Sequence, residues 1–117
     1  MPTWHRSQYQ HNYALYTELR RCEYPDWAVT VLFYAVLQLV DEVLEQSRGT
    51  PPVDHYDRDR AARAMPATKP VSEAYVLLRS LSERARYKRS WYELGDTLEQ
   101  AELLFTEVQE HLLSQMA

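Results

Sequence analysis

The strongest hydrophobic pattern in this chain is a long apolar run in its first half. Residues 27–40 are apolar on almost every side of a helix, and the run ends at Asp41 and Glu42. A helix with this pattern is typically surrounded by the other elements of a protein. We therefore expect a buried helix from about Trp27 to Gln46, which emerges into water where its acidic residues begin.

Three further segments have apolar residues at helical spacing along one side. They are residues 4–22, residues 72–86 and residues 98–112. Four helices with short connections bury their apolar stripes by packing on one another, most simply as an up-and-down bundle. The expected fold is therefore all-α, a four-helix up-and-down bundle that forms a single domain over residues 1–117.

Prolines, glycines and aspartates mark the ends of these helices. Gly49 precedes two prolines and is expected to end the apolar helix, and residues 65–70 contain two more prolines. Between these breaks, the polar segment 55–64 predicts a short extra helical turn between the second and third long helices. Asp26 and Asp96 are the expected N-caps of the second and fourth helices.

The composition narrows the classes of function. Only two of the 117 residues are glycine, which argues against a β-fold with many tight turns. Cys22 is the only cysteine and the histidines lack metal-ligand spacing, so we expect no disulfide, no metal and no cofactor. No secretion-signal pattern and no apolar run of about 18 residues occur, so we expect a cytoplasmic protein outside the membrane.

Charge is distributed unevenly along the chain. The net charge is −4, which argues against a general nucleic-acid binder. However, residues 58–89 contain nine Lys or Arg and three Asp or Glu, a local net charge of +6. Residues 90–117 contain six acidic residues and no Lys or Arg. The protein therefore has a basic middle between acidic ends.

Several short motifs follow one another in an order that is typical of a known family. They are Tyr24-Pro-Asp-Trp-Ala-Val29, Leu32-Phe-Tyr-Ala35, His55-Tyr-Asp-Arg-Asp-Arg60 and Ser82-Glu-Arg-Ala-Arg-Tyr87, preceded by Gln10-His-Asn12. This order resembles the small bacterial HEPN domains. The resemblance implies a helical bundle that forms a homodimer and acts on RNA in bacterial defence, stress or toxin-antitoxin systems.

Many HEPN proteins share an arginine followed closely by a histidine, which together cleave RNA without a metal at the dimer interface. In this chain only Arg6 and His11 have that spacing, and they lie near the N-terminus rather than in a later helix. Gln38 stands where related core helices are expected to have a histidine. The sequence therefore leaves open whether the protein is an enzyme, which would be a metal-independent endoribonuclease.

His55 and Arg58 are the candidate catalytic residues. They are three residues apart, hence on one face of a helix. An imidazole exchanges protons near neutral pH, and a guanidinium binds a phosphate with paired hydrogen bonds. The alternative is structural, in which the two residues brace the loop against Asp54 or Asp57.

Arg84, Arg86 and Tyr87 are the candidate RNA-binding or nucleotide-binding residues. They belong to a segment that alternates cations with aromatic rings and continues to Tyr92, as in sites that hold phosphates and stack bases. The alternative is a solvated helix end that contacts the acidic last helix. Accordingly, a second hypothesis for the whole chain is a non-enzymatic interaction module that docks a partner protein, such as an antitoxin or a larger effector.

Overall fold

The computed structural model describes residues 4–87 and 90–116 and contains only helices in these ranges. The long helices are α1 (Trp4–Arg21), α2 (Pro25–Arg48), α4 (Ser72–Tyr87) and α5 (Gly95–Gln115). Between α2 and α4 lie α3 (His55–Ala64) and the 3₁₀ turn η1 (Lys69–Val71), and η2 (Trp91–Glu93) precedes α5. The expected all-α class is confirmed.

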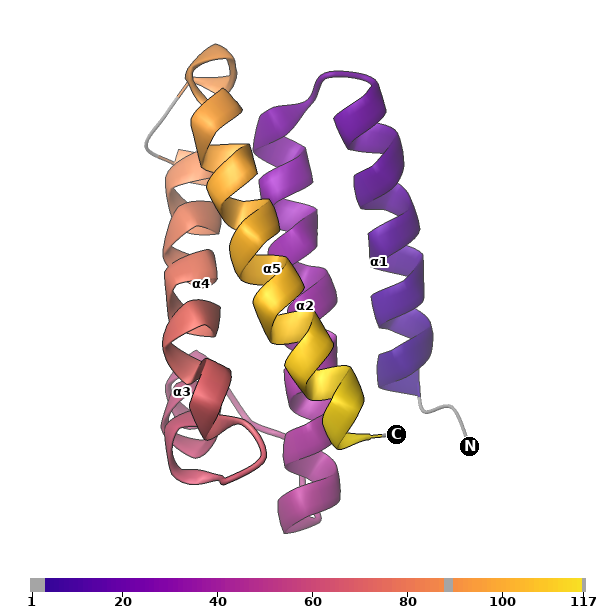
Figure 1. Cartoon of the computed structure of the whole chain (residues 1–117), viewed down its shortest axis with the longest axis vertical. Coiled ribbons are helices and arrows are strands. Elements are labelled where there is room, and N and C mark those ends of the chain that lie inside the picture. The colour runs from indigo at the N-terminus through magenta and orange to yellow at the C-terminus, as the bar shows by residue number, and fades with distance from the viewer. Residues whose placement is uncertain (1–3, 88–89, 117) are drawn as a thin grey trace.

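The long helices pack side by side, roughly as a bundle. Figure 1 shows α2 behind α5, with α1 and α4 on either side and α3 beside the start of α4. As expected, α2 is the central element, because it packs against α1, α4 and α5 and most of its side chains are buried. Its apolar residues form one continuous core with those of the other long helices.

Two details at the helix starts differ from the expectation. Helix α2 begins at Pro25, so Asp26 lies in its first turn, and the capping position is Tyr24. Likewise, α5 begins at Gly95, which places Asp96 in the first turn rather than at the cap. Proline is favourable in a first turn, where its missing N–H is not needed, and this extends α2 by two residues.

The segment between α2 and α4 contains more regular structure than the single helical turn that was expected. Helix α3 has ten residues, and the Asp54 side chain caps it by accepting a hydrogen bond from the Asp57 N–H at 2.8 Å. Gly49 ends α2 as expected, with a φ of 86° that suits a residue without Cβ.

The expectation that α2 emerges into water at its acidic residues is wrong. Asp41 is 6% exposed and Glu42 is 4% exposed. Each carboxylate is paired with an arginine from another helix, Asp41 with Arg58 and Glu42 with Arg6. Burial of a charge is tolerated when a partner of opposite charge makes hydrogen bonds to it, and these partners come from distant parts of the chain.

Helix α2 is also long and apolar enough, by length and composition alone, to cross a membrane. In the structure, 78% of its most apolar window is buried against the other helices. Burial of this kind is typical of the core helix of a bundle.

Candidate functional site

The candidate residues Arg86 and Tyr87 lie at the end of α4, beside α2. The Arg86 guanidinium carbon lies 5.6 Å from the centre of the Tyr34 ring and 5.4 Å from that of Tyr87. These distances are within the range of cation–π attraction. In addition, Arg86 Nη1 donates a hydrogen bond to Ser82 Oγ at 3.3 Å. The guanidinium is therefore held against two aromatic faces.

A hollow of about 190 Å³ lies directly beside this arginine. It is lined by Asp26, Trp27 and Thr30 from the first turns of α2 and by Ala85, Arg86 and Tyr87 from α4. The Asp26 atom Oδ1 is buried, and within the described residues it has no hydrogen-bond partner. Buried polar atoms are nearly always hydrogen-bonded, so this oxygen, which is closed to solvent beside the hollow, is an exception.

Aromatic side chains gather on the same end of the bundle. Those more than half exposed are Tyr24, Trp27, Tyr87, Trp91 and Tyr92, and we call this set the aromatic end. A second, larger hollow lies between Tyr24, Trp27 and Trp91 and is also lined by Asp26. Exposed aromatic residues in such number are uncommon on a surface without a partner. Lys88 and Arg89, which the sequence groups with this segment, lie outside the described residues.

The structure brings the candidate pair His55 and Arg58 together. Arg58 Nη1 lies 3.1 Å from His55 Nδ1, and the His55 ring lies 6.1 Å from that of Phe33. Arg58 is 8% exposed, and its Nε and Nη2 donate hydrogen bonds to the two carboxylate oxygens of Asp41 at 2.6 and 3.1 Å. The guanidinium is thus occupied by a buried carboxylate, but that carboxylate belongs to Asp41 and not to Asp54 or Asp57, which the structural alternative named.

Burial lowers the pKa of His55, and the nearby charges of Arg58 and Arg79 lower it further. The imidazole is therefore neutral at pH 7. Because Nδ1 accepts a hydrogen bond from Arg58, the single proton of the neutral ring lies on Nε2. In this tautomer Nε2–H can donate a hydrogen bond but cannot accept a proton.

A further pair of opposite charges lies beside Arg58. Asp59 on α3 pairs with Arg79 on α4, close to the buried side chain of Tyr75. Burial raises the pKa of the Tyr75 hydroxyl. Within the described residues, the three buried side-chain atoms without a partner are Asp26 Oδ1, Asp59 Oδ1 and the Tyr75 hydroxyl oxygen. Asp59 and Tyr75 lie where α3 meets α4, whereas Asp26 lies in the first turn of α2, beside the far end of α4.

Two aromatic residues of α2 connect the predicted sites. The Phe33 and Tyr34 rings lie 5.1 Å apart, Phe33 contacts His55, and Arg86 lies over Tyr34. His55 and Arg86 therefore belong to one side of the molecule, at different heights along α2. The earlier pair Arg6 and His11 is separate from both, because Arg6 binds Glu42 and His11 is exposed on α1.

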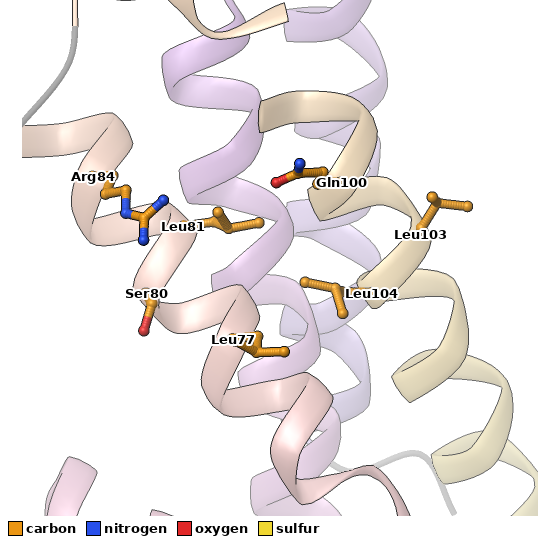
Figure 2. Close-up of a pocket in the computed structure, with 7 residues that line it drawn as sticks. All are labelled: Leu77, Ser80, Leu81, Arg84, Gln100, Leu103 and Leu104. Carbon is orange, nitrogen blue, oxygen red and sulfur yellow. The ribbon is translucent and has the colours of Figure 1, made fainter. Parts of the chain in front are cut away.

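Arg84 lies on a different face from Arg86. It lines a groove of about 430 Å³ between α4 and α5, together with Leu77, Ser80, Leu81, Gln100, Leu103 and Leu104. Figure 2 shows Arg84 and Gln100 at one end of the groove and Leu77 and Leu104 at the other. Consequently, the predicted set Arg84, Arg86 and Tyr87 does not form one site.

Sequence analysis missed Asp26 and Trp27 as site residues, because their positions at a helix start suggested a cap and a core aromatic. Their proximity in sequence to the helix break gave no sign that the end of α4 packs beside them.

Within residues 4–87 and 90–116, no group of three or more His, Cys, Asp or Glu is placed to hold a metal ion. No family model, curated protein or solved structure matches this chain.

Proposed function

We propose that this chain binds single-stranded RNA or a nucleotide at the aromatic end of its bundle. The observation that carries the proposal is the position of Arg86, which lies over two aromatic rings beside a hollow. Exposed rings stack on bases of any sequence, and a neighbouring arginine adds cation–π attraction and binds phosphate. Trp27 and Tyr87, which line the same hollow as Arg86, are both more than half exposed and so are available for stacking.

The charge pattern supports binding of a short segment rather than a long one. Four of the nine basic residues at positions 58–89 pair with an acidic residue, so part of the basic middle of the chain is neutralised within the protein. They are Arg58, Arg60, Arg63 and Arg79. If one or two phosphates are contacted, a plot of the logarithm of the affinity against the logarithm of the salt concentration should have a slope of about −0.7 to −1.4.

The resemblance to HEPN domains adds detail to this proposal. It supports an up-and-down arrangement of the four long helices, a homodimer and a cytoplasmic role in bacterial defence, stress or a toxin-antitoxin system. Gln38, which stands where a histidine was expected, has a structural role here, because its Oε1 accepts a hydrogen bond from Nδ1 of the buried His5 at 2.9 Å. We therefore propose that the protein binds RNA and that His55 and Arg58 do not cleave it.

The test is fluorescence anisotropy of a labelled, mixed-sequence single-stranded RNA, titrated with the wild-type protein and four variants. We expect Arg86→Ala and Tyr87→Ala each to weaken binding about tenfold, because each removes a stacking or cation–π contact. Arg60→Ala and Tyr56→Ala are matched controls, since these side chains are about as exposed as Tyr87 and lie on α3. Equal binding by all five proteins would refute the proposed site.

A second candidate function is protein docking through the groove between α4 and α5. Leu77 is 55% exposed and Leu103 is 75% exposed, and exposed leucines on two adjacent helices are typical of an interface. Within the described residues, Arg84 has no ion-pair partner, and Glu107 on α5 follows Leu103 by one helical turn, away from Arg84.

This arrangement of charge fits a second copy of the chain. If two grooves face each other across a two-fold axis near the leucines, Arg84 of each copy meets Glu107 of the other. Such a contact would bury the leucines and form two ion pairs, each between Arg84 of one copy and Glu107 of the other. We therefore propose a homodimer through this groove as the alternative to an unrelated protein partner.

A further inference from the structure

We infer that the hollow between the turn after α1, the start of α2 and η2 binds a quaternary ammonium group, such as that of choline. The inference goes beyond RNA binding and does not depend on it, because Arg86 does not line this hollow. It is carried by three aromatic residues and two acidic residues around a volume of about 420 Å³.

The aromatic residues that line this hollow come from three separate parts of the chain. Tyr24 lies in the turn after α1, Trp27 in the first turn of α2 and Trp91 in η2. Each is more than half exposed and is therefore available to a ligand. A cation is attracted to the face of an aromatic ring, most strongly to that of tryptophan, and several such rings together are typical of sites for quaternary ammonium ligands.

The charged residues that line the hollow are both acidic. They are Glu23 and Asp26, and no Lys or Arg of the described residues lines it. Asp26 Oδ1 is closed to solvent, so Asp26 acts here through its negative charge and not through a hydrogen bond from that atom. Glu23 is exposed and forms no ion pair within the described residues. The lining is therefore negative, which attracts a cation and repels a phosphate.

Glu23 has a backbone conformation that is unusual for a residue with a Cβ atom. Its φ is 65°, and it follows the end of α1, where glycine or asparagine is common in this conformation. Strained residues of this kind cluster at functional sites. The position of the Glu23 carboxylate beside the three aromatic residues therefore supports a role in binding.

A quaternary ammonium suits this lining better than a primary ammonium does. Its methyl groups spread the charge over an apolar surface that can contact aromatic faces. A primary ammonium is strongly hydrated and needs hydrogen-bond acceptors in place of its water. Aromatic faces are not strong acceptors, and Asp26 Oδ1 is closed to a ligand.

The experiment is isothermal titration calorimetry of the wild-type protein with choline and with 3,3-dimethylbutan-1-ol, at constant ionic strength. The alcohol has the shape of choline with a carbon in place of the charged nitrogen. We expect choline to bind about tenfold or more tightly than the alcohol, because only choline gains the attraction to rings and carboxylates. Trimethyllysine, which carries the same group, should also bind, and the tighter of the two ligands shows whether a small molecule or a modified side chain is preferred.

Two variants test the location of the site. We expect Trp91→Leu to weaken choline binding about tenfold and Glu23→Gln about threefold. Trp4→Leu and Glu110→Gln are the matched controls, since they make the same changes at exposed positions, the first of them at the opposite end of α1. Circular dichroism checks that all four variants are folded.

Equal affinity for choline and the alcohol, or no binding of choline, would overturn the inference. Choline binding that is unchanged in both Trp91→Leu and Glu23→Gln would overturn it as well. Arg86→Ala should bind choline like the wild type and bind RNA more weakly, so the failure of one proposal is distinguishable from the failure of the other.

Discussion

Asp41 and Arg58 form a bidentate ion pair inside the protein, with hydrogen bonds of 2.6 and 3.1 Å between α2 and α3. Both residues are less than a tenth exposed. Removing one partner leaves the other charge buried without compensation, at a cost of about 3–5 kcal/mol. The pair therefore holds α3 against the centre of the bundle.

We expect Arg58→Met to lower the free energy of unfolding by about 3–5 kcal/mol, measured by urea denaturation. The double variant Asp41→Leu with Arg58→Met should recover most of that loss, because apolar side chains of similar size replace the pair. A double variant no more stable than the single one would show that the two side chains do not act as a pair.

The environment of His55 predicts that the protein does not cleave RNA. At pH 7 the ring is neutral, since burial and two arginines lower its pKa, and its Nδ1 is occupied by Arg58. We expect labelled single-stranded RNA and tRNA to remain intact without added metal, as seen on denaturing gels. Cleavage by the wild-type protein that is lost in His55→Ala would contradict this expectation and establish a metal-independent ribonuclease.

The hydrogen bonds of Asp57 predict how the stability of the fold changes in acid. Hydrogen bonds from Arg48 and from the Val53 N–H lower the pKa of Asp57 to about 2, whereas the unfolded value is about 3.9. This lowered pKa stabilises the fold above pH 4, and the contribution is lost as the pH falls toward 2. We expect the melting temperature of the wild type to exceed that of Asp57→Asn at pH 7 and the difference to vanish near pH 2. A difference that stays constant with pH would refute the assignment.

The groove between α4 and α5 predicts a dimer that depends on charge. We expect Arg84→Glu and Glu107→Arg each to shift the protein toward the monomer, because each places like charges opposite one another at two symmetric positions. The double variant should restore the dimer, as measured by analytical ultracentrifugation at equal concentration. Leu103→Glu, which places a charge at the centre of the contact, should be monomeric.

A wild-type protein that is monomeric at all accessible concentrations would overturn the proposed dimer. In that case, a different protein would be the partner suited to the exposed leucines. Arg60→Glu serves as the control for charge reversal, because its side chain is 72% exposed on α3 and away from the groove.

Local patterns were sufficient to predict the helices. The apolar run of residues 27–40 predicted the central helix, and the breaks at Gly49 and at residues 65–70 agree with its end and with the start of α4. These features depend on spacing within a few turns of the chain. They can be inferred from sequence because a helix forms hydrogen bonds only between near neighbours.

The partners of charged residues were decided by the tertiary structure. Asp41 ends an apolar run and was expected in water, but Arg58, 17 residues later, pairs with it when α3 folds back on α2. Similarly, Arg84 and Arg86 are two residues apart in sequence yet line different hollows, because they point to different sides of α4. The sequence by itself determined which residues are helical and which are charged. Only packing of the helices decided which charges are neutralised and that Asp26 lies beside Arg86, since such pairings depend on contacts between distant segments.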